Sequence, residues 1–246
     1  MNVKTIRFCA VLTAVGVCAA GLAGCDVPGM GSIPGSGVSA TDERVVSSFD
    51  RLSAGGFGEL VIHFGEGEYV TVEGDDNIVP DVETRVRGGE LTIGLARGNY
   101  DPKLPLRITV GANELLAVDV SGAVDVTAER LRGQTLDLTV SGAASASIAS
   151  IDVGELVVNV SGAGDCVLSG GTVDVLRVTA SGAGSLSARD VECRVAEAAA
   201  SGAGDVLLHV LEDLDASASG AGSILYSGSP AVRKHTSGAG SVTSVE

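Results

Sequence analysis

The sequence predicts an all-β protein: a parallel β-helix, or β-solenoid, of about seven coils with 18–20 residues in each. The first observation is a Ser-Gly-Ala triplet that recurs seven times at near-constant spacing, as in stacked structural repeats. The second is that apolar and polar residues alternate around the triplets, as in half-buried strands. The third is composition: 35 glycines among 246 residues and 3% aromatics predict many tight bends and a core of aliphatic side chains.

The N-terminal residues 1–24 have the three-part composition of a secretory signal peptide. Lys4 and Arg7 give a positive start, residues 8–21 form an apolar run that is short for a membrane span, and small residues follow. The Leu-Ala-Gly-Cys sequence that ends at Cys25 resembles a bacterial lipobox. The alternative is an ordinary signal peptide with a chance cysteine. We predict cleavage before Cys25 and its lipidation, which would hold the chain to a membrane.

The segment from Cys25 to residue 41 is expected to be a flexible tether. It is rich in Gly, Pro and Ser and has no apolar period. Asp26 follows the cysteine, and in some Gram-negative bacteria an Asp at this position resembles an inner-membrane retention signal. The sequence therefore predicts a place in the bacterial cell envelope and leaves open whether it is periplasmic or on the outer surface.

Residues 42–115 are predicted to form an irregular β region. Apolar-rich runs separated by turn residues indicate strands at 58–64, 68–73, 82–86, 90–95 and 106–110. These runs lack the Ser-Gly-Ala triplet. The end of a solenoid exposes an unpaired strand edge, so we expect this region to cap the repeats.

Residues 116–246 carry the repeats. The triplets are separated by 20, 20, 20, 20, 18 and 18 residues, and they begin at Ser121, Ser141, Ser161, Ser181, Ser201, Ser219 and Ser237. Before the second triplet, Leu136, Leu138 and Val140 alternate with polar residues, and equal residue types recur at equal offsets in the other copies. Antiparallel hairpins fit the alternation alone. The equal offsets favour parallel coils stacked in register, with the coil expected to be right-handed and neighbouring strands about 4.8 Å apart.

An acidic column supports the stacking. The fourth residue after each serine is, in order, Asp125, Ser145, Asp165, Ser185, Asp205, Ser223 and Ser241. No two aspartates are consecutive in this series, so stacking would place them about 9.6 Å apart and avoid repulsion between adjacent carboxylates.

The repeats resemble a known bacterial family. The Ser-Gly-Ala-Gly-Asp sequences at 161–165 and 201–205, the opening 45–60 and Glu-Leu-Thr-Ile at 90–93 together resemble the domain of unknown function called "putative auto-transporter adhesin, head GIN". The family repeats a loose isGSGdv pattern, in which Ala here replaces the middle small residue. The resemblance covers about residues 42–244 and implies a β-helical fold in the cell envelope. Autotransport in the strict sense is not expected, because anchoring is expected to be by lipid.

The sequence offers no recognisable catalytic or metal-ligating motif. Cys166 and Cys193 stand at offsets that other copies fill with aliphatic residues, so we expect two buried thiols without a disulfide. The histidines have no metal-ligand spacing; His63 and His209 are expected to face outward, and His235 to lie at a solvated end. A calcium β-roll would need an Asp in every copy of a nine-residue period. We therefore predict no catalytic residues, no metal and no cofactor, and the binding residues stay unknown.

The sequence predicts a non-catalytic lipoprotein of the cell envelope that acts in adhesion, ligand binding or envelope scaffolding. The formal charge is −15, and residues 1–24 hold two of the 16 basic and none of the 31 acidic residues, which leaves −17; such a chain repels nucleic acid. The expected partners are the membrane, through the lipid on Cys25, and a glycan or protein ligand, with a homo-oligomer also open. The alternative is a polysaccharide lyase or hydrolase, but the outward acids Asp119, Asp137 and Asp174 are scattered along the repeats.

Overall fold

The computed structural model describes residues 31–245 of the chain, and these are almost entirely β structure. The predicted signal peptide, Cys25 and the start of the predicted tether lie outside the described residues. No helix within the described range is long and apolar enough to cross a membrane. The elements are β1 (Ile33–Pro34), β2 (Ser39–Arg44), β3 (Arg51–Phe64), β4 (Tyr69–Asp75), the 3-10 turn η1 (Val79–Asp81), β5 (Val82–Arg87), β6 (Glu90–Leu95), β7 (Tyr100–Asp101), β8 (Arg107–Ala112), β9 (Ala117–Ala128), β10 (Leu131–Val140), β11 (Ser145–Ile148), β12 (Ile151–Val160), β13 (Cys166–Leu168), β14 (Gly171–Gly182), β15 (Leu186–Gly202), β16 (Val206–Gly220), β17 (Ile224–Ser227), β18 (Ala231–Gly238) and β19 (Val242–Ser244).

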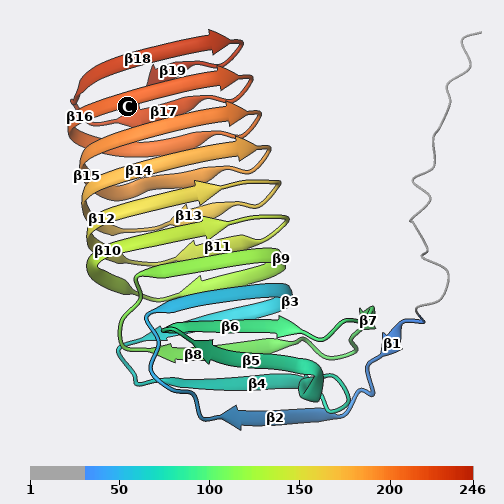
Figure 1. Cartoon of the computed structure of the whole chain (residues 1–246). Helices are drawn as coiled ribbons and strands as arrows, with labels where there is room; N and C mark the ends of the chain where they lie inside the picture. The colour runs from blue at the N-terminus through green and yellow to red at the C-terminus, as the bar shows by residue number, and fades with distance from the viewer. Residues whose placement is uncertain (1–30, 246) are drawn as a thin grey trace, which may run out of the picture. The chain divides into compact units, whose positions relative to one another are not determined.

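The repeats form a parallel β-solenoid, which confirms the predicted fold. Strands of successive repeats pair in parallel, so that Leu136 pairs with Leu156 and Leu156 with Leu176. Between β15 and β16 the register shifts at two points. The 18-residue spacing of the last copies is kept in the pairing of Ala216 with Lys234. Figure 1 shows these coils stacked from β9 to β18. Seven triplets delimit six full turns, in line with the prediction of about seven coils.

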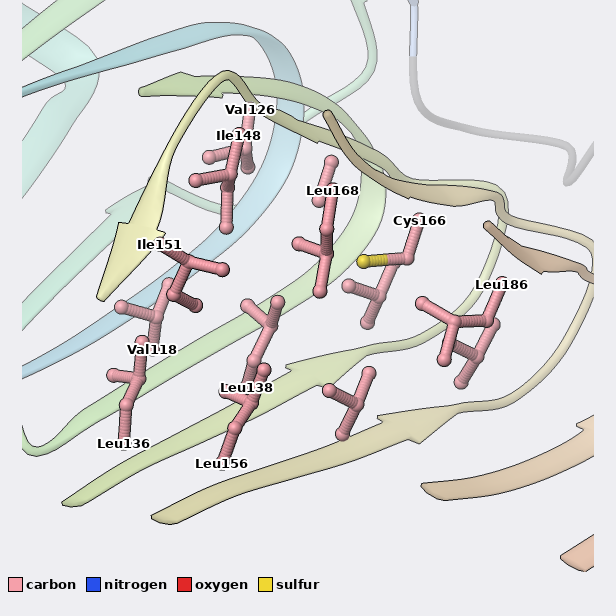
Figure 2. Packing of buried hydrophobic residues seen from close by; sticks show 14 of the residues in the cluster. Val118, Val126, Leu136, Leu138, Ile148, Ile151, Leu156, Cys166, Leu168 and Leu186 are labelled. Carbon is pink, nitrogen blue, oxygen red and sulfur yellow. The ribbon is translucent and has the colours of Figure 1, made fainter. Parts of the chain in front are cut away.

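The interior of the solenoid is filled by aliphatic columns. Val118, Leu138 and Val158 are each 1% exposed or less, and they succeed one another along the stack. Figure 2 shows such side chains pointing toward one another from opposite walls of the coil. Burying one Val or Leu side chain contributes about 1.5–3 kcal/mol, so period-two alternation gives a continuous core without large rings.

A column of glycines forms one corner of every coil. The glycine of each triplet has a positive φ, for example +87° at Gly162 and +92° at Gly182. A Cβ atom on Gly182 would lie 2.4 Å from the carbonyl oxygen of Gly162 in the coil below. The next residue, Ala183, donates its N–H to that same oxygen at 2.8 Å. The triplet therefore needs glycine both for its conformation and for the close approach of two backbones.

The solenoid begins earlier than residue 116. Strand β3 pairs in parallel with β9 over twelve consecutive positions, from Arg51 with Ala117 to Ile62 with Ala128. The prediction that all of 42–115 is irregular is therefore wrong for residues 51–64. Gly56 takes the place of the triplet glycine below Gly122, and the inward pattern of the repeats continues through β3.

The remaining N-terminal strands form a mixed sheet region. Strand β3 pairs in parallel with β6 along its first part and with β8 along its second. Strand β4 then lies antiparallel between β8 and β2, and β5 lies antiparallel to β6. Strand pairing thus changes from parallel to antiparallel beyond β3, so the strand edge of the first coil is paired and the predicted cap is present.

The predicted tether is wrong for its last part. Residues 33–34 form β1 on β7, and residue 39 already begins β2 on β4. The buried carboxylate of Asp75, which is 1% exposed, fastens this segment: it accepts backbone N–H bonds from Gly37 at 2.6 Å, Lys103 at 2.9 Å and Leu104 at 3.0 Å. The segment is held in place by a carboxylate 38 positions from Gly37, so its local composition gave no sign of this structure.

Replacing Asp75 with asparagine is expected to lower the urea midpoint at pH 7. The N–H group of Leu104, followed by those of Gly37 and Lys103, holds the pKa of the Asp75 carboxyl below its usual value. Such a group stabilises the fold above its unfolded pKa of about 3.9, and the effect is lost as the pH falls through the lower folded pKa. The difference between the two proteins should therefore shrink below about pH 4. Asp101→Asn, at an exposed acid nearby, is the control and should leave the midpoint unchanged.

Candidate binding site

An open groove lies beside the first corner of the solenoid. It has a volume of about 430 Å³, within the range of small-molecule sites. One wall is the corner of β3 and the other is the end of β6 with the loop that leads to β7. The lining residues are Gly55, Gly56, Phe57, Gly94, Leu95, Ala96, Arg97, Gly98, Asn99 and Tyr100.

Two aromatic side chains meet in this groove. The rings of Phe57 and Tyr100 have centroids 6.2 Å apart and are tilted by 48°. The Tyr100 hydroxyl lies 3.2 Å from Oδ2 of Asp81 and 3.1 Å from the carbonyl oxygen of Ala96. Burial, followed by the nearby Asp81 carboxylate, raises the pKa of Tyr100. The phenol is thus neutral and fixed at both contacts, so the ring is held in place before any ligand arrives.

The fold explains why Phe57 points outward. In the strand pairing, Phe57 takes the position of Ala123, and the alanine of every later triplet is exposed at the same corner. Gly56 has a φ of +116°, and a Cβ atom there would lie 3.3 Å from Cδ1 of Leu95 across the groove. The corner therefore presents one ring where each later coil presents a methyl group.

The charge of the groove differs from that of the whole chain. Arg97 is the one charged residue among those that line it, in a chain of formal charge −15. Among the ion pairs of the described residues, none includes Arg97, and its side chain is exposed. Asn99 is also exposed, and its backbone carbonyl accepts a 2.7 Å hydrogen bond from Ile33. The groove therefore offers a guanidinium group and an amide beside two rings.

The acidic column predicted from the repeats is confirmed. Ser145 donates its hydroxyl to Asp125 one coil below. The backbone N–H of Ser185 bonds to Asp165 at 3.0 Å, and that of Ser223 bonds to Asp205 at 2.9 Å. Each aspartate is thus held by the residue above it.

The acidic column also extends one coil beyond the prediction, to strand β3. Glu59 stacks against Asp125, so two acids are adjacent here. Arg107 of β8 lies 2.7 Å from the Glu59 carboxylate, and this contact offsets their repulsion.

Asp119, Asp137 and Asp174, the outward acids named from the sequence, are exposed on β9, β10 and β14. Other acidic side chains on the outer face of the coils are paired with arginines. Arg177 lies between Glu155 and Glu197 on neighbouring coils. Arg194 bonds to Glu212 at 3.1 Å, and Arg233 lies 3.3 Å from Asp215. These pairs are exposed, so each contributes up to about 1 kcal/mol. The paired acids include Glu197 and Asp215, which are adjacent in the register of β15 and β16.

The two cysteines are buried and free, as predicted. Burial raises the pKa of Cys166 and of Cys193 to about 12, so both are uncharged core residues.

The side chains of His63 and His209 each contact a hydroxyl group. His63 lies 2.7 Å from the Tyr69 hydroxyl, and His209 lies 2.8 Å from the hydroxyl of Ser227. Both histidines are partly exposed, in line with the outward orientation predicted for them.

The groove was missed by reasoning from the sequence. The Gly-Gly-Phe-Gly-Glu sequence at 55–59 is a degenerate triplet followed by the acidic position. Apolar residues alternate on both sides of it, and this alternation would have identified 55–59 as a corner of the solenoid: Leu52, Ala54, Leu60 and Ile62. No comparable signal marks Arg97 or Tyr100, because their place depends on how the loop between β6 and β7 lies against a strand 40 residues earlier.

Solved structures share this fold. A crystal structure described as a "putative adhesin" from Bacteroides fragilis matches with 26% identity and a TM-score of 0.83, covering 87% of this chain and all of that one. A "putative adhesin" from Parabacteroides merdae matches with 20% identity and a TM-score of 0.71, over 87% of this chain and 99% of that one. A "putative lipid binding protein" from Parabacteroides distasonis matches with 21% identity and a TM-score of 0.71, over 88% of this chain and all of that one.

Family membership is settled by the sequence match. No curated protein matches the chain. A family model matches residues 48–230, a range that begins just before β3 and ends just before β18, and so contains the groove and nearly all of the solenoid. The chain belongs to the family described as "Putative auto-transporter adhesin, head GIN domain".

Proposed function

We propose that this chain is a lipid-anchored, non-catalytic binding protein of the bacterial cell envelope, acting in adhesion or ligand capture. The observation that carries the proposal is the groove at Phe57 and Tyr100: it is lined by two aromatic rings, of which Tyr100 is held by hydrogen bonds, and by Arg97, which is exposed and in no ion pair of the described residues. Recognition requires such convergent apolar and polar groups. Hydrolysis of a glycan generally requires two carboxyl groups at a defined separation, and the residues that line this groove include none.

The sequence before the fold supports the anchor. The Leu-Ala-Gly-Cys sequence ending at Cys25 resembles a lipobox, and β1 begins eight residues later at Ile33. Eight residues span at most about 30 Å when fully extended. Because β1 pairs with β7, which contains Tyr100, a lipid on Cys25 would keep the groove close to the membrane surface.

The anchor predicts a simple labelling result. Full-length chain expressed in a bacterium supplied with radioactive palmitate should carry the label and sediment with membranes. Cys25→Ser should lose all of the label, because the thiol that accepts the acyl chains is gone. Cys18→Ser, within the predicted signal peptide, is the matched control and should be labelled like the parent. Equal labelling of the Cys25→Ser protein would rule out this anchor.

Ligand capture without cleavage is tested on the purified full-length chain in detergent. The protein is applied to an array of bacterial and host glycans and to an array of envelope proteins, and release of glycan products is measured in the same wells. Binding with intact glycans is the expected result. Product release would replace the proposal with the polysaccharide-cleaving alternative, and no binding on either array would contradict a role in ligand capture.

A further inference from the structure

We propose that the groove at Phe57 and Tyr100 binds an acidic saccharide, a pyranose that carries a carboxylate, within a polymer of the cell's own envelope. The inference rests on the proposed function and names its ligand. Four features of the groove support it: its rings, its charge, its open shape and its place near the first residues of the fold.

The rings select a flat ligand with polar edges. The Phe57 and Tyr100 rings are tilted by 48° with centroids 6.2 Å apart, so they form a splayed pair rather than a closed stack. Aromatic faces carry partial negative charge, and the C–H groups on one face of a pyranose carry partial positive charge. A sugar ring can therefore lie against one aromatic face while its hydroxyl groups reach the amide of Asn99, which both donates and accepts hydrogen bonds.

The charge selects an anion with a single negative charge. Arg97 brings the one formal charge among the lining residues, and a guanidinium group pairs with a carboxylate through two parallel hydrogen bonds. A phosphate monoester carries about −1.5 to −2 charges at neutral pH, and one guanidinium group would leave part of that charge unbalanced. The single cation therefore favours a carboxylate over a phosphate monoester.

The open shape favours a sugar over an acyl chain. Gly56, Arg97, Gly98 and Asn99 are exposed rim residues, so one side of any ligand stays in water. An acyl chain would keep part of its apolar surface in water, whereas the hydroxyl groups of a sugar are hydrated there without a loss of free energy. Tyr100 is already fixed by Asp81 and by the carbonyl of Ala96, which reduces the entropy lost on binding.

The place of the groove favours an envelope polymer as the source. Tyr100 belongs to β7, and β7 pairs with β1 at Ile33 and Pro34. With the lipid on Cys25, the groove stays within a few tens of ångströms of the membrane. Strand β18 lies at the opposite end of the stack of coils from β1 and β7 (Figure 1). A site that binds another cell would be expected at the β18 end, which lies farther from the lipid anchor.

The experiment measures calorimetric binding of three probes to the full-length chain in detergent. The first is an oligogalacturonate of six residues, the second is the same hexamer with its carboxylates methyl-esterified, and the third is inorganic polyphosphate. We expect the oligogalacturonate to bind at least ten-fold more tightly than its ester. Polyphosphate should bind at least ten-fold more weakly than the oligogalacturonate.

Three variants assign the binding to the groove. Arg97→Gln should weaken oligogalacturonate binding at least ten-fold and leave binding of the ester unchanged. Phe57→Leu keeps an apolar side chain but removes the ring, and it should weaken both hexamers. Arg130→Gln removes an exposed charge outside the groove and should change neither. Circular dichroism shows whether each variant keeps the β fold of the parent.

The outcomes separate this inference from the proposed function. Equal binding of the hexamer and its ester, or equal loss in the Arg97→Gln and Arg130→Gln proteins, would overturn the acidic-saccharide site. Tight binding of polyphosphate would replace it with a general anion site. If the hexamers fail to bind while the chain is palmitoylated and captures another ligand on the arrays, the proposed function stands and this inference falls. Failure of labelling and of all binding would remove both.

Binding of isolated cell-wall fragments tests the source. Carboxylated glycans prepared from the producing bacterium should compete with the oligogalacturonate for the groove, and the same fragments with methyl-esterified carboxylates should not. If only glycans from other organisms compete, the envelope source is wrong.

Discussion

Gly182→Ala is expected to lower the free energy of unfolding by about 3 kcal/mol or more. Gly182 has a φ of +92°, a conformation that costs a residue with a Cβ atom about 1–3 kcal/mol. The new Cβ would also lie 2.4 Å from the carbonyl oxygen of Gly162 and 3.0 Å from its nitrogen. These are backbone atoms, so no side-chain rotation relieves the contact. Moving them apart would stretch the hydrogen bond from Ala183 to the same oxygen, now 2.8 Å.

The comparison is made with Gly133→Ala in the same solenoid. A Cβ atom on Gly133 would meet nothing closer than the carbonyl oxygen of Thr135 at 3.6 Å, and its φ is not positive. Replacing such a glycine usually stabilises a protein by about 0.4–1 kcal/mol, because the unfolded chain loses freedom. Urea unfolding followed by circular dichroism should move the two midpoints in opposite directions. Similar shifts for both variants would mean that the corner does not require glycine.

The corner prediction shows why the repeats could be predicted from the sequence. Backbone stacking requires glycine at one position, and aliphatic side chains at alternate positions fill the space inside, so both demands recur in every coil and are visible as columns. Cys166 and Cys193 follow the same logic, since each stands in a column of aliphatic residues and is buried there.

Features without repetition were not predictable in this way. The order of residues 33–44 depends on the Asp75 carboxylate and on pairing with β4 and β7, which are contacts between residues at least 26 positions apart. The groove needs the loop before Tyr100 to lie against Phe57, and nothing in the composition of that loop specifies where it lies. A strand was predicted at 58–64, within β3, but its place in a solenoid coil was missed because Gly55 and Phe57 replace the serine and alanine of the triplet.

Lys234 is a second case in which column position matters more than composition. From the sequence, His235 is expected to lie at a solvated end beside Arg233 and Lys234, and the structure exposes all three residues. Lys234 also belongs to a column. In the structure it pairs with Ala216 and so continues the buried column of Val118, Leu138 and Val158. Its ammonium group donates to the carbonyl of Val242 at 3.0 Å and lies 5.1 Å from the centre of the Tyr226 ring. The aliphatic stem thus covers the open end of the core while the charge stays near water.

A charge in an inward-facing position protects the last coil from pairing with another chain. Among the described strands, β18 has register pairing with β16 alone, so its other edge has free N–H and C=O groups. Exposed edges of this kind associate unless a charge or a bulge interferes. Thr236 continues the column of Ala200 and Ala218, and it adds a second polar residue at the same end. We predict that Lys234 and Thr236 disfavour pairing of this edge with a second chain.

The double variant Lys234→Val with Thr236→Val is therefore expected to dimerise end to end. Two identical edges would pair in antiparallel fashion about a two-fold axis, with a dissociation constant on the order of 10 µM, or about −7 kcal/mol. Sedimentation equilibrium in one detergent should show the parent as a monomer at concentrations where the double variant is mostly dimer. Arg233→Val, on the outward face of the same strand, removes one charge and should stay monomeric. A monomeric double variant would show that another feature protects this edge, and a dimeric Arg233→Val would show that net charge, rather than the inward position of Lys234, controls association.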